Sequence, residues 1–168
     1  MKRIVLTLMG IIAFAGAACA QNYIVVDSEK IFKSIASYNE AIKTLDELAE
    51  SYQKQVDDKF ADVEKLYNNY MAQKSNLSDK SRQTIENAIL SREEDAAKFQ
   101  ESLFGTDGTL MKKRIELIQP IQNRVFKAIE EYAAANNYDL VLDTASNPTI
   151  LFYSAAADHT DAIIALLK

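Results

Sequence analysis

The residues with the greatest potential for catalysis or metal binding lie near the C-terminus. His159 is the only histidine of the chain, and Asp158 and Asp161 stand close to it. Zinc sites in proteins are dominated by several His or Cys ligands, so one imidazole with two nearby carboxylates is a weak signal. Asp158 or Thr160 would equally suit the start of a helix, where a side-chain oxygen accepts a backbone N–H. We therefore expect helix capping here, and neither a metal ion nor a cofactor.

Other catalytic parts are scarce. A single histidine makes a Ser-His-Asp arrangement improbable, and Cys19 is the only cysteine of the chain. No glycine-rich loop of the kind that binds phosphate is present. The 24 acidic residues outnumber the 19 basic ones, which argues against non-specific binding of nucleic acid. We expect that the protein is not an enzyme.

Residues 1–20 are typical of a secretory signal peptide. A positively charged start precedes an apolar stretch over residues 4–14, and a run of small residues ends at Ala20. We expect cleavage after Ala20, export to the periplasm and no stable membrane insertion. Cys19 leaves lipidation as an alternative, but Gly16 occupies the position where lipidation sites usually carry a leucine-like residue.

The mature chain is poor in residues that break helices. From Gln21 onward its only glycines and prolines are Gly105, Gly108, Pro120 and Pro148. A chain with so few turn formers must consist of long elements. Because Lys2 and Arg3 leave with the signal peptide, the mature chain carries a net charge of −7.

Apolar residues recur every seven positions between residues 37 and 76, as in a coiled coil. This stretch is about forty residues, so it predicts a helix roughly 60 Å long that must project from a small body. A second register is interrupted by Lys59 and Gln73. The first register consists of Ile42, Ala49, Val56, Val63, Tyr70 and Leu77.

The polar residues 75–79 predict a turn, with Ser78 capping a returning helix. The segment 105–108 holds Gly105 and Gly108, and we interpret it as a break and possible hinge in that return. A further helix is expected over residues 109–136. Pro120 would either bend this helix or stand in the first turn of a helix that begins later.

Both ends of the mature chain indicate a small α/β body. Residues 23–26 predict a strand, and residues 138–143 and 149–153 predict a β-hairpin. A final helix is expected over residues 161–167. The predicted class is mainly α with a small β part: a helical hairpin arm at 37–108 projects from a three-stranded body formed by 21–36 and 109–168. The core of this body is expected to contain Ile24, Val26, Leu140, Leu142, Ile150 and Phe152.

The order of these elements resembles the Skp/OmpH family of periplasmic chaperones. The first strand and helix entry, residues 24–32, match one end of the family pattern, and residues 138–143 with 157–164 match the other. The resemblance implies a homotrimer whose arms surround a cavity, in which unfolded outer-membrane proteins are held without ATP. Well-known members are strongly basic, whereas this chain is acidic, so binding of anionic lipid is in doubt.

A holdase needs weak, non-directional contacts with its client, and apolar side chains beside the main heptad register would supply them. The alternative for each residue is ordinary packing between the two helices of the arm. A structural coiled-coil spacer or adaptor of the cell envelope remains the second hypothesis for the whole protein. The candidate contacts with the client are Phe60, Tyr67, Met71, Leu77 and Phe104.

Overall fold

The structure, a computed structural model, describes residues 22–168, and the predicted signal peptide lies outside them. This part of the chain forms two compact units. Residues 36–123 make up the arm unit, and residues 22–35 together with 124–168 make up the body unit.

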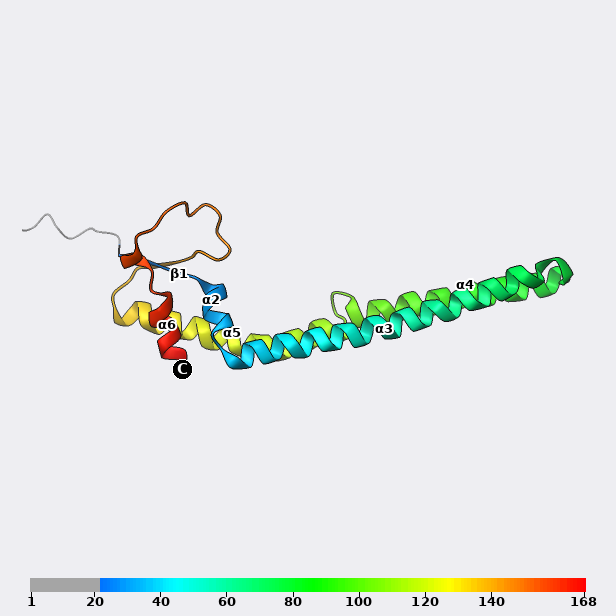
Figure 1. The fold of residues 1–168 in the computed structure, drawn as a ribbon, viewed down its shortest axis with the longest axis horizontal. Helices are drawn as coiled ribbons and strands as arrows, with labels where there is room; N and C mark the ends of the chain where they lie inside the picture. Colours follow the sequence, from blue (N-terminus) through cyan, green and yellow to red (C-terminus); the bar gives the residue numbers. More distant parts are fainter. Residues whose placement is uncertain (1–21) are drawn as a thin grey trace, which may run out of the picture. The chain divides into compact units, whose positions relative to one another are not determined.

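Two long helices that run in opposite directions form most of the arm unit (Figure 1). Helix α3, Ala36–Gln73, has 38 residues, which corresponds to about 57 Å at 1.5 Å per residue. A 3₁₀ turn, η1, Lys74–Asn76, then leads into helix α4, Asp79–Phe104. The oxygen of Ser78 accepts a hydrogen bond from the Ser81 N–H at 3.3 Å. The predicted helical hairpin and the cap of its returning helix are therefore confirmed.

The heptad positions hold the two helices together. Val56 and Tyr70 of α3 are buried, as are Ala96 and Leu103 of α4. The hydroxyl of Tyr70 donates a hydrogen bond to Glu86, which satisfies the polar end of an otherwise buried ring. Burial of one apolar stripe per helix therefore fixes the pairing of α3 with α4.

Residues 109–123 belong to the arm unit, whereas the sequence placed them in the body. They form the first part of helix α5, Thr109–Ala135. Ile118 is buried against Ala41 and Leu45, because the apolar stripe of α3 begins here and needs a partner. The surrounding apolar side chains are Tyr38, Ile42, Leu110, Leu117 and Ile121.

Both mature glycines lie in the break between α4 and α5, and close packing requires them. A Cβ atom on Gly108 would lie 2.7 Å from the Leu103 carbonyl oxygen and 2.8 Å from the Gly105 nitrogen. A Cβ atom on Gly105 would lie 2.5 Å from the Glu101 carbonyl oxygen. Both glycines have ordinary negative φ angles, so their role here is steric. That this break acts as a hinge stays a prediction.

Helix α5 is continuous from Thr109, with Pro120 in its interior. The alternative in which Pro120 opens a later helix is therefore wrong. The helix ends as its two asparagines suggest: Asn137 adopts a left-handed φ of 57°. The Tyr138 N–H then donates to the Ala133 carbonyl at 2.9 Å, which is the 6→1 hydrogen bond of a Schellman motif.

The body unit contains a two-stranded parallel sheet. Strand β1, Tyr23–Val26, pairs with β2, Leu140–Asp143, with Tyr23 opposite Leu140. Helices α2, Ser28–Lys33, and α6, Thr160–Leu167, contact each other, and a short 3₁₀ turn, η2, Ala155–Ala157, precedes α6. The apolar core of this unit is built from Ile24, Val25, Val26, Ile31 and Ile163, each at most 2% exposed.

The predicted β-hairpin is wrong. Residues 149–153 form no strand, and the chain after β2 is irregular up to η2. The partner of β2 is β1, and Thr144 extends that pairing by donating its N–H to the Val26 carbonyl at 2.8 Å. On its other edge β1 forms an isolated bridge between Val25 and Asp158. Residues 149–153 therefore have no strand partner within the described chain.

Candidate functional site

The structure places His159 in an aromatic cluster of the body unit. Its Nδ1 lies 2.7 Å from the Tyr132 hydroxyl, and its Nε2 lies 3.4 Å from the Tyr138 hydroxyl. The ring also packs against both tyrosine rings. Within residues 22–168 no group of three or more His, Cys, Asp or Glu side chains is placed to hold a metal ion. The histidine is therefore part of the packing between the end of α5 and the start of α6.

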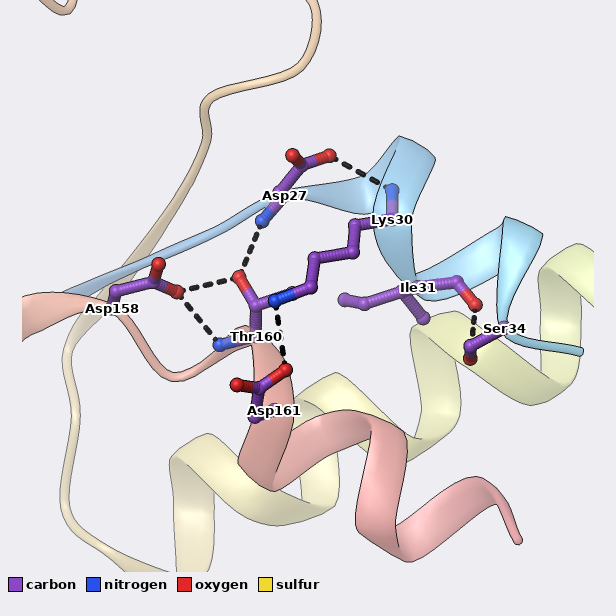
Figure 2. Close-up of polar contacts among 7 residues, drawn as sticks. All are labelled: Asp27, Lys30, Ile31, Ser34, Asp158, Thr160 and Asp161. Atoms are coloured by element: carbon purple, nitrogen blue, oxygen red, sulfur yellow. Dashed lines mark hydrogen bonds and ion pairs between the residues drawn. The ribbon is translucent and has the colours of Figure 1, made fainter.

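The two neighbouring aspartates hold the start of α6, one within its own segment and the other against α2 (Figure 2). Asp158 accepts a hydrogen bond from the Thr160 N–H at 2.9 Å and another from the Thr160 hydroxyl. These bonds stabilise the charged carboxylate and lower the pKa of Asp158 below its ordinary value. Asp161 forms an ion pair with Lys30 of α2 at 2.8 Å. Asp158 thus binds the first N–H of α6, although the N-cap position itself is His159, which makes no side-chain cap bond.

Thr160 connects three elements of the body unit. Its hydroxyl accepts the Asp27 N–H at 2.9 Å, at the end of β1, and donates to Asp158 (Figure 2). Only 1% of the residue is exposed. The Asp27 carboxylate in turn accepts the Lys30 N–H at 2.9 Å and so caps α2. This network is structural.

Asp143 performs a similar task at the end of β2. Its two carboxylate oxygens accept the N–H of Ser28 at 3.0 Å and the Ser28 hydroxyl at 2.7 Å. They also accept the Ala145 N–H and the Ser146 hydroxyl, both at 3.1 Å. Burial alone would raise the pKa of Asp143, but these hydrogen bonds outweigh it and the pKa is lowered. Asp143 thus links β2 to the start of α2.

Four of the five predicted client contacts lie on the surface of the arm unit. Phe60 and Phe104 are 36% and 37% exposed, and Tyr67 and Met71 are 48% and 49% exposed. Leu77 is half-buried in the turn between α3 and α4. Packing between the helices therefore buries only part of the surface of each of these four side chains.

Sequence reasoning missed three further exposed apolar residues of the arm unit, namely Leu90, Met111 and Ile115. Leu90 is 62% exposed and Ile115 is 51% exposed. None of the three stands in the heptad register of α3. Leu90 and Met111 each directly follow a half-buried apolar residue, Ile89 and Leu110, which was the available signal.

All of these side chains lie on one side of the arm unit. At 3.6 residues per turn, each side chain lies roughly an eighth to a third of a turn from the buried interface of its own helix, always in the same direction of rotation along the chain. Helices α4 and α5 run antiparallel to α3 and face it. The same angular offset from the interface therefore puts the exposed apolar side chains of α3 and those of α4 and α5 on the same side of the arm unit. We call this surface the apolar face. It consists of Phe60, Tyr67, Met71, Leu90, Phe104, Met111 and Ile115.

The six residues predicted for the core of the body differ in burial: two are buried, two are half-buried and two are exposed. Ile24 and Val26 are buried in the core, and Leu142 and Ile150 are half-buried. Leu140 is 53% exposed and Phe152 is 86% exposed, so neither belongs to the core of the single chain. Phe152 is exposed because the segment around it forms no strand. Neighbouring exposed apolar residues that the sequence did not single out are Tyr23, Leu151 and Tyr153.

The basic run 112–114 lies in α5, and Lys113 alone of its three residues forms an ion pair within the described chain. Lys113 forms an ion pair with Glu116, one turn further along α5, at 2.8 Å.

None of the helices in residues 22–168 is both long and apolar enough to cross a membrane.

Comparison with known proteins identifies the family. The family described as outer membrane protein (OmpH-like) matches residues 22–167, which covers both units of the structure. No individually curated protein matches the chain. The long helical hairpin and the small sheet agree with the fold of that family. The chain therefore belongs to the OmpH-like family, whose members have a chaperone-type role in the periplasm.

Proposed function

We propose that the protein is an ATP-independent holdase that binds unfolded outer-membrane proteins in the periplasm. The apolar face is the observation that carries this proposal. Its seven large apolar side chains are at least 36% exposed, yet they are gathered on one side of the arm unit. A row of exposed apolar side chains offers many weak contacts without a fixed geometry, which suits clients of different sequence.

We also propose that the protein acts as a homotrimer assembled through its body unit, with the client held between the arms. Leu151 and Phe152 are 93% and 86% exposed, in a segment that has no strand partner within residues 22–168. The edge of β2 that faces away from β1 is unpaired in the two-stranded sheet. Apolar side chains and open strand edges of this kind favour association between copies.

Aggregation of an unfolded β-barrel protein tests the proposal. The purified protein should suppress aggregation without ATP, and light scattering should give the mass of a trimer. The double variant Tyr67→Ser with Met71→Ser should weaken suppression about tenfold, because each side chain contributes apolar area to the contact. The matched control is Gln55→Ser with Gln73→Ser, which changes exposed residues of α3 away from the apolar face.

A monomer that fails to suppress aggregation would contradict the holdase. A spacer or adaptor would instead bind one folded partner and show little affinity for unfolded chains. Equal loss of activity in both double variants would show that the apolar face is not the contact surface.

A further inference from the structure

The α3 part of the apolar face combines apolar side chains with negative charge. The flank of α3 that presents Phe60, Tyr67 and Met71 contains several acidic residues. Lys43, seven positions before Glu50, is the one cation on this flank between residues 39 and 71, and it forms an ion pair with Glu47 at 3.7 Å. The acidic residues of this flank are Asp46, Glu50, Asp57 and Glu64.

Helix α4 repeats this pattern on the same side. The flank that presents Leu90 and Phe104 contains Glu86, Glu93 and Glu101. Between residues 83 and 104 this flank lacks lysine and arginine. The two helices therefore form one continuous surface that is both apolar and acidic.

Few of these acids are neutralised by the protein itself. Glu86 is bonded to Tyr70 and lies 3.9 Å from the Lys74 ammonium, near the turn. Asp57 accepts a hydrogen bond from the uncharged Gln53 amide at 2.8 Å. Within residues 22–168 the acids of this surface that form no ion pair are Asp46, Glu50, Asp57, Glu64, Glu93 and Glu101.

Most basic residues of α3 and α4 lie on other sides of these helices, and several form ion pairs there. Lys54, for example, lies on the side of α3 away from α4 and contacts Asp58 at 2.7 Å. Lys59 lies on the opposite flank, 4.8 Å from the centre of the Phe99 ring. The remaining ion pairs of these two helices are Lys43 with Glu47, Lys65 with Asp62, Arg82 with Asp79, and Lys98 with Glu94.

We propose that the apolar face selects unfolded segments in which apolar residues alternate with lysine or arginine, over equally apolar segments that are acidic. This inference rests on the proposed holdase function and names the class of client. An apolar segment loses water-exposed area on this face whatever its charge. Only a basic segment also gains favourable Coulomb interactions, since an acidic one meets like charges.

The side chains on the face suit cationic residues in a second way. Lysine and arginine have long apolar stems that cover apolar surface while the charged group reaches a carboxylate. The rings of Phe60, Tyr67 and Phe104 also offer faces for cation–π contacts. Each of these rings is at least 36% exposed and so is accessible to a client.

Two labelled, unstructured peptides test the selectivity. One mixes leucine, valine and tyrosine with lysine, and the other carries glutamate in place of every lysine. At low ionic strength the protein should bind the lysine peptide about tenfold more tightly than the glutamate peptide. The difference should disappear near 1 M salt, where the Debye length is about 3 Å.

A pair of variants with equal changes of net charge locates the effect. The face variant combines Asp46→Asn, Glu50→Gln, Asp57→Asn and Glu64→Gln. The control variant combines Glu40→Gln, Glu47→Gln, Asp58→Asn and Asp62→Asn, all on α3 away from the apolar face. The face variant should lose the preference for the lysine peptide, and the control variant should keep most of it.

Each outcome bears on a different claim. Equal affinity of the unmodified protein for both peptides, or equal effects of the two variants, would overturn the inference and leave the holdase intact. Failure to bind either peptide at any salt concentration would contradict the holdase itself. A change in the oligomeric mass of the face variant alone would show that a second copy covers the face, which also overturns the inference.

Discussion

Thr160 links elements that are far apart in the sequence. Its hydroxyl accepts a bond from Asp27, which lies 133 positions earlier, and donates to Asp158. Because the residue is 1% exposed, water cannot replace either bond. This hydroxyl therefore strengthens the attachment of α6 to the start of α2, beside the Lys30–Asp161 ion pair.

Thr160→Val should destabilise the body unit by about 1–3 kcal/mol, since valine keeps the shape but leaves the Asp27 N–H without a buried acceptor. Urea unfolding followed by circular dichroism measures the change. Thr160→Ser, which retains the hydroxyl, should recover most of the stability. Equal stability of the valine variant and the unmodified protein would show that the bond is not needed.

The carboxylates of Asp143 and Asp158 should make the body unit sensitive to acid. Both have pKa values lowered below the ordinary 3.8, so each contributes stability above pH 3.8 that is lost as pH falls through the folded value. Stability measured by urea unfolding should therefore decline below about pH 4. Asp143→Asn should be less stable near pH 7 and should show a flatter decline in acid. An unchanged pH profile in this variant would contradict the assignment.

Sequence reasoning anticipated local hydrogen bonding of Asp158 or Thr160 at the start of α6 but not the role of Asp143. The first is local, because Asp158 and Thr160 are two positions apart. The second depends on the parallel register of β1 and β2, which brings Asp143 to Ser28 across 115 positions. A contact of that kind has no local pattern in the sequence.

At the scale of the elements, the break between α4 and α5 tolerates little added volume. A methyl group at Gly108 would meet backbone atoms of Leu103 and Gly105 at less than 3.0 Å, and backbone cannot rotate away. Gly108→Ala should destabilise the arm unit by roughly 1–3 kcal/mol, as overpacking does. Thermal unfolding followed by circular dichroism measures this loss.

Thr106→Ala is the control for Gly108→Ala. Thr106 is exposed in the same loop, so its replacement should have little effect on stability. If Gly108→Ala also melts at the temperature of the unmodified protein, the loop adapts more easily than its packing suggests.

The long helices were predictable, whereas the sheet was predicted only in part. Heptad spacing and the near absence of Gly and Pro are local signals, and they located α3, α4 and the turn between them. Residues 149–153 have the composition of a strand but form none; β2 pairs with β1, and its second edge stays open in the two-stranded sheet. Strand composition indicates suitability for pairing and does not name the partner.

At the scale of the whole molecule, the exposed segment around Phe152 is the natural place to test assembly. Leu151 and Phe152 are the two most exposed large apolar residues in the structure, at 93% and 86%. Burial of two such side chains at each contact would contribute several kcal/mol, at about 1.5–3 kcal/mol for each fully buried residue. The proposed trimer should therefore depend on them.

The double variant Leu151→Ser with Phe152→Ser should shift the trimer to monomer, as measured by light scattering over a range of protein concentrations. Circular dichroism should remain nearly unchanged, because neither side chain is part of the core of the single chain. Leu90→Ser is the control, since Leu90 is equally apolar and 62% exposed but lies on the arm unit. A trimer that persists in the double variant would place the interface elsewhere. A monomeric variant that still prevents aggregation would show that single arms bind clients without a shared cavity.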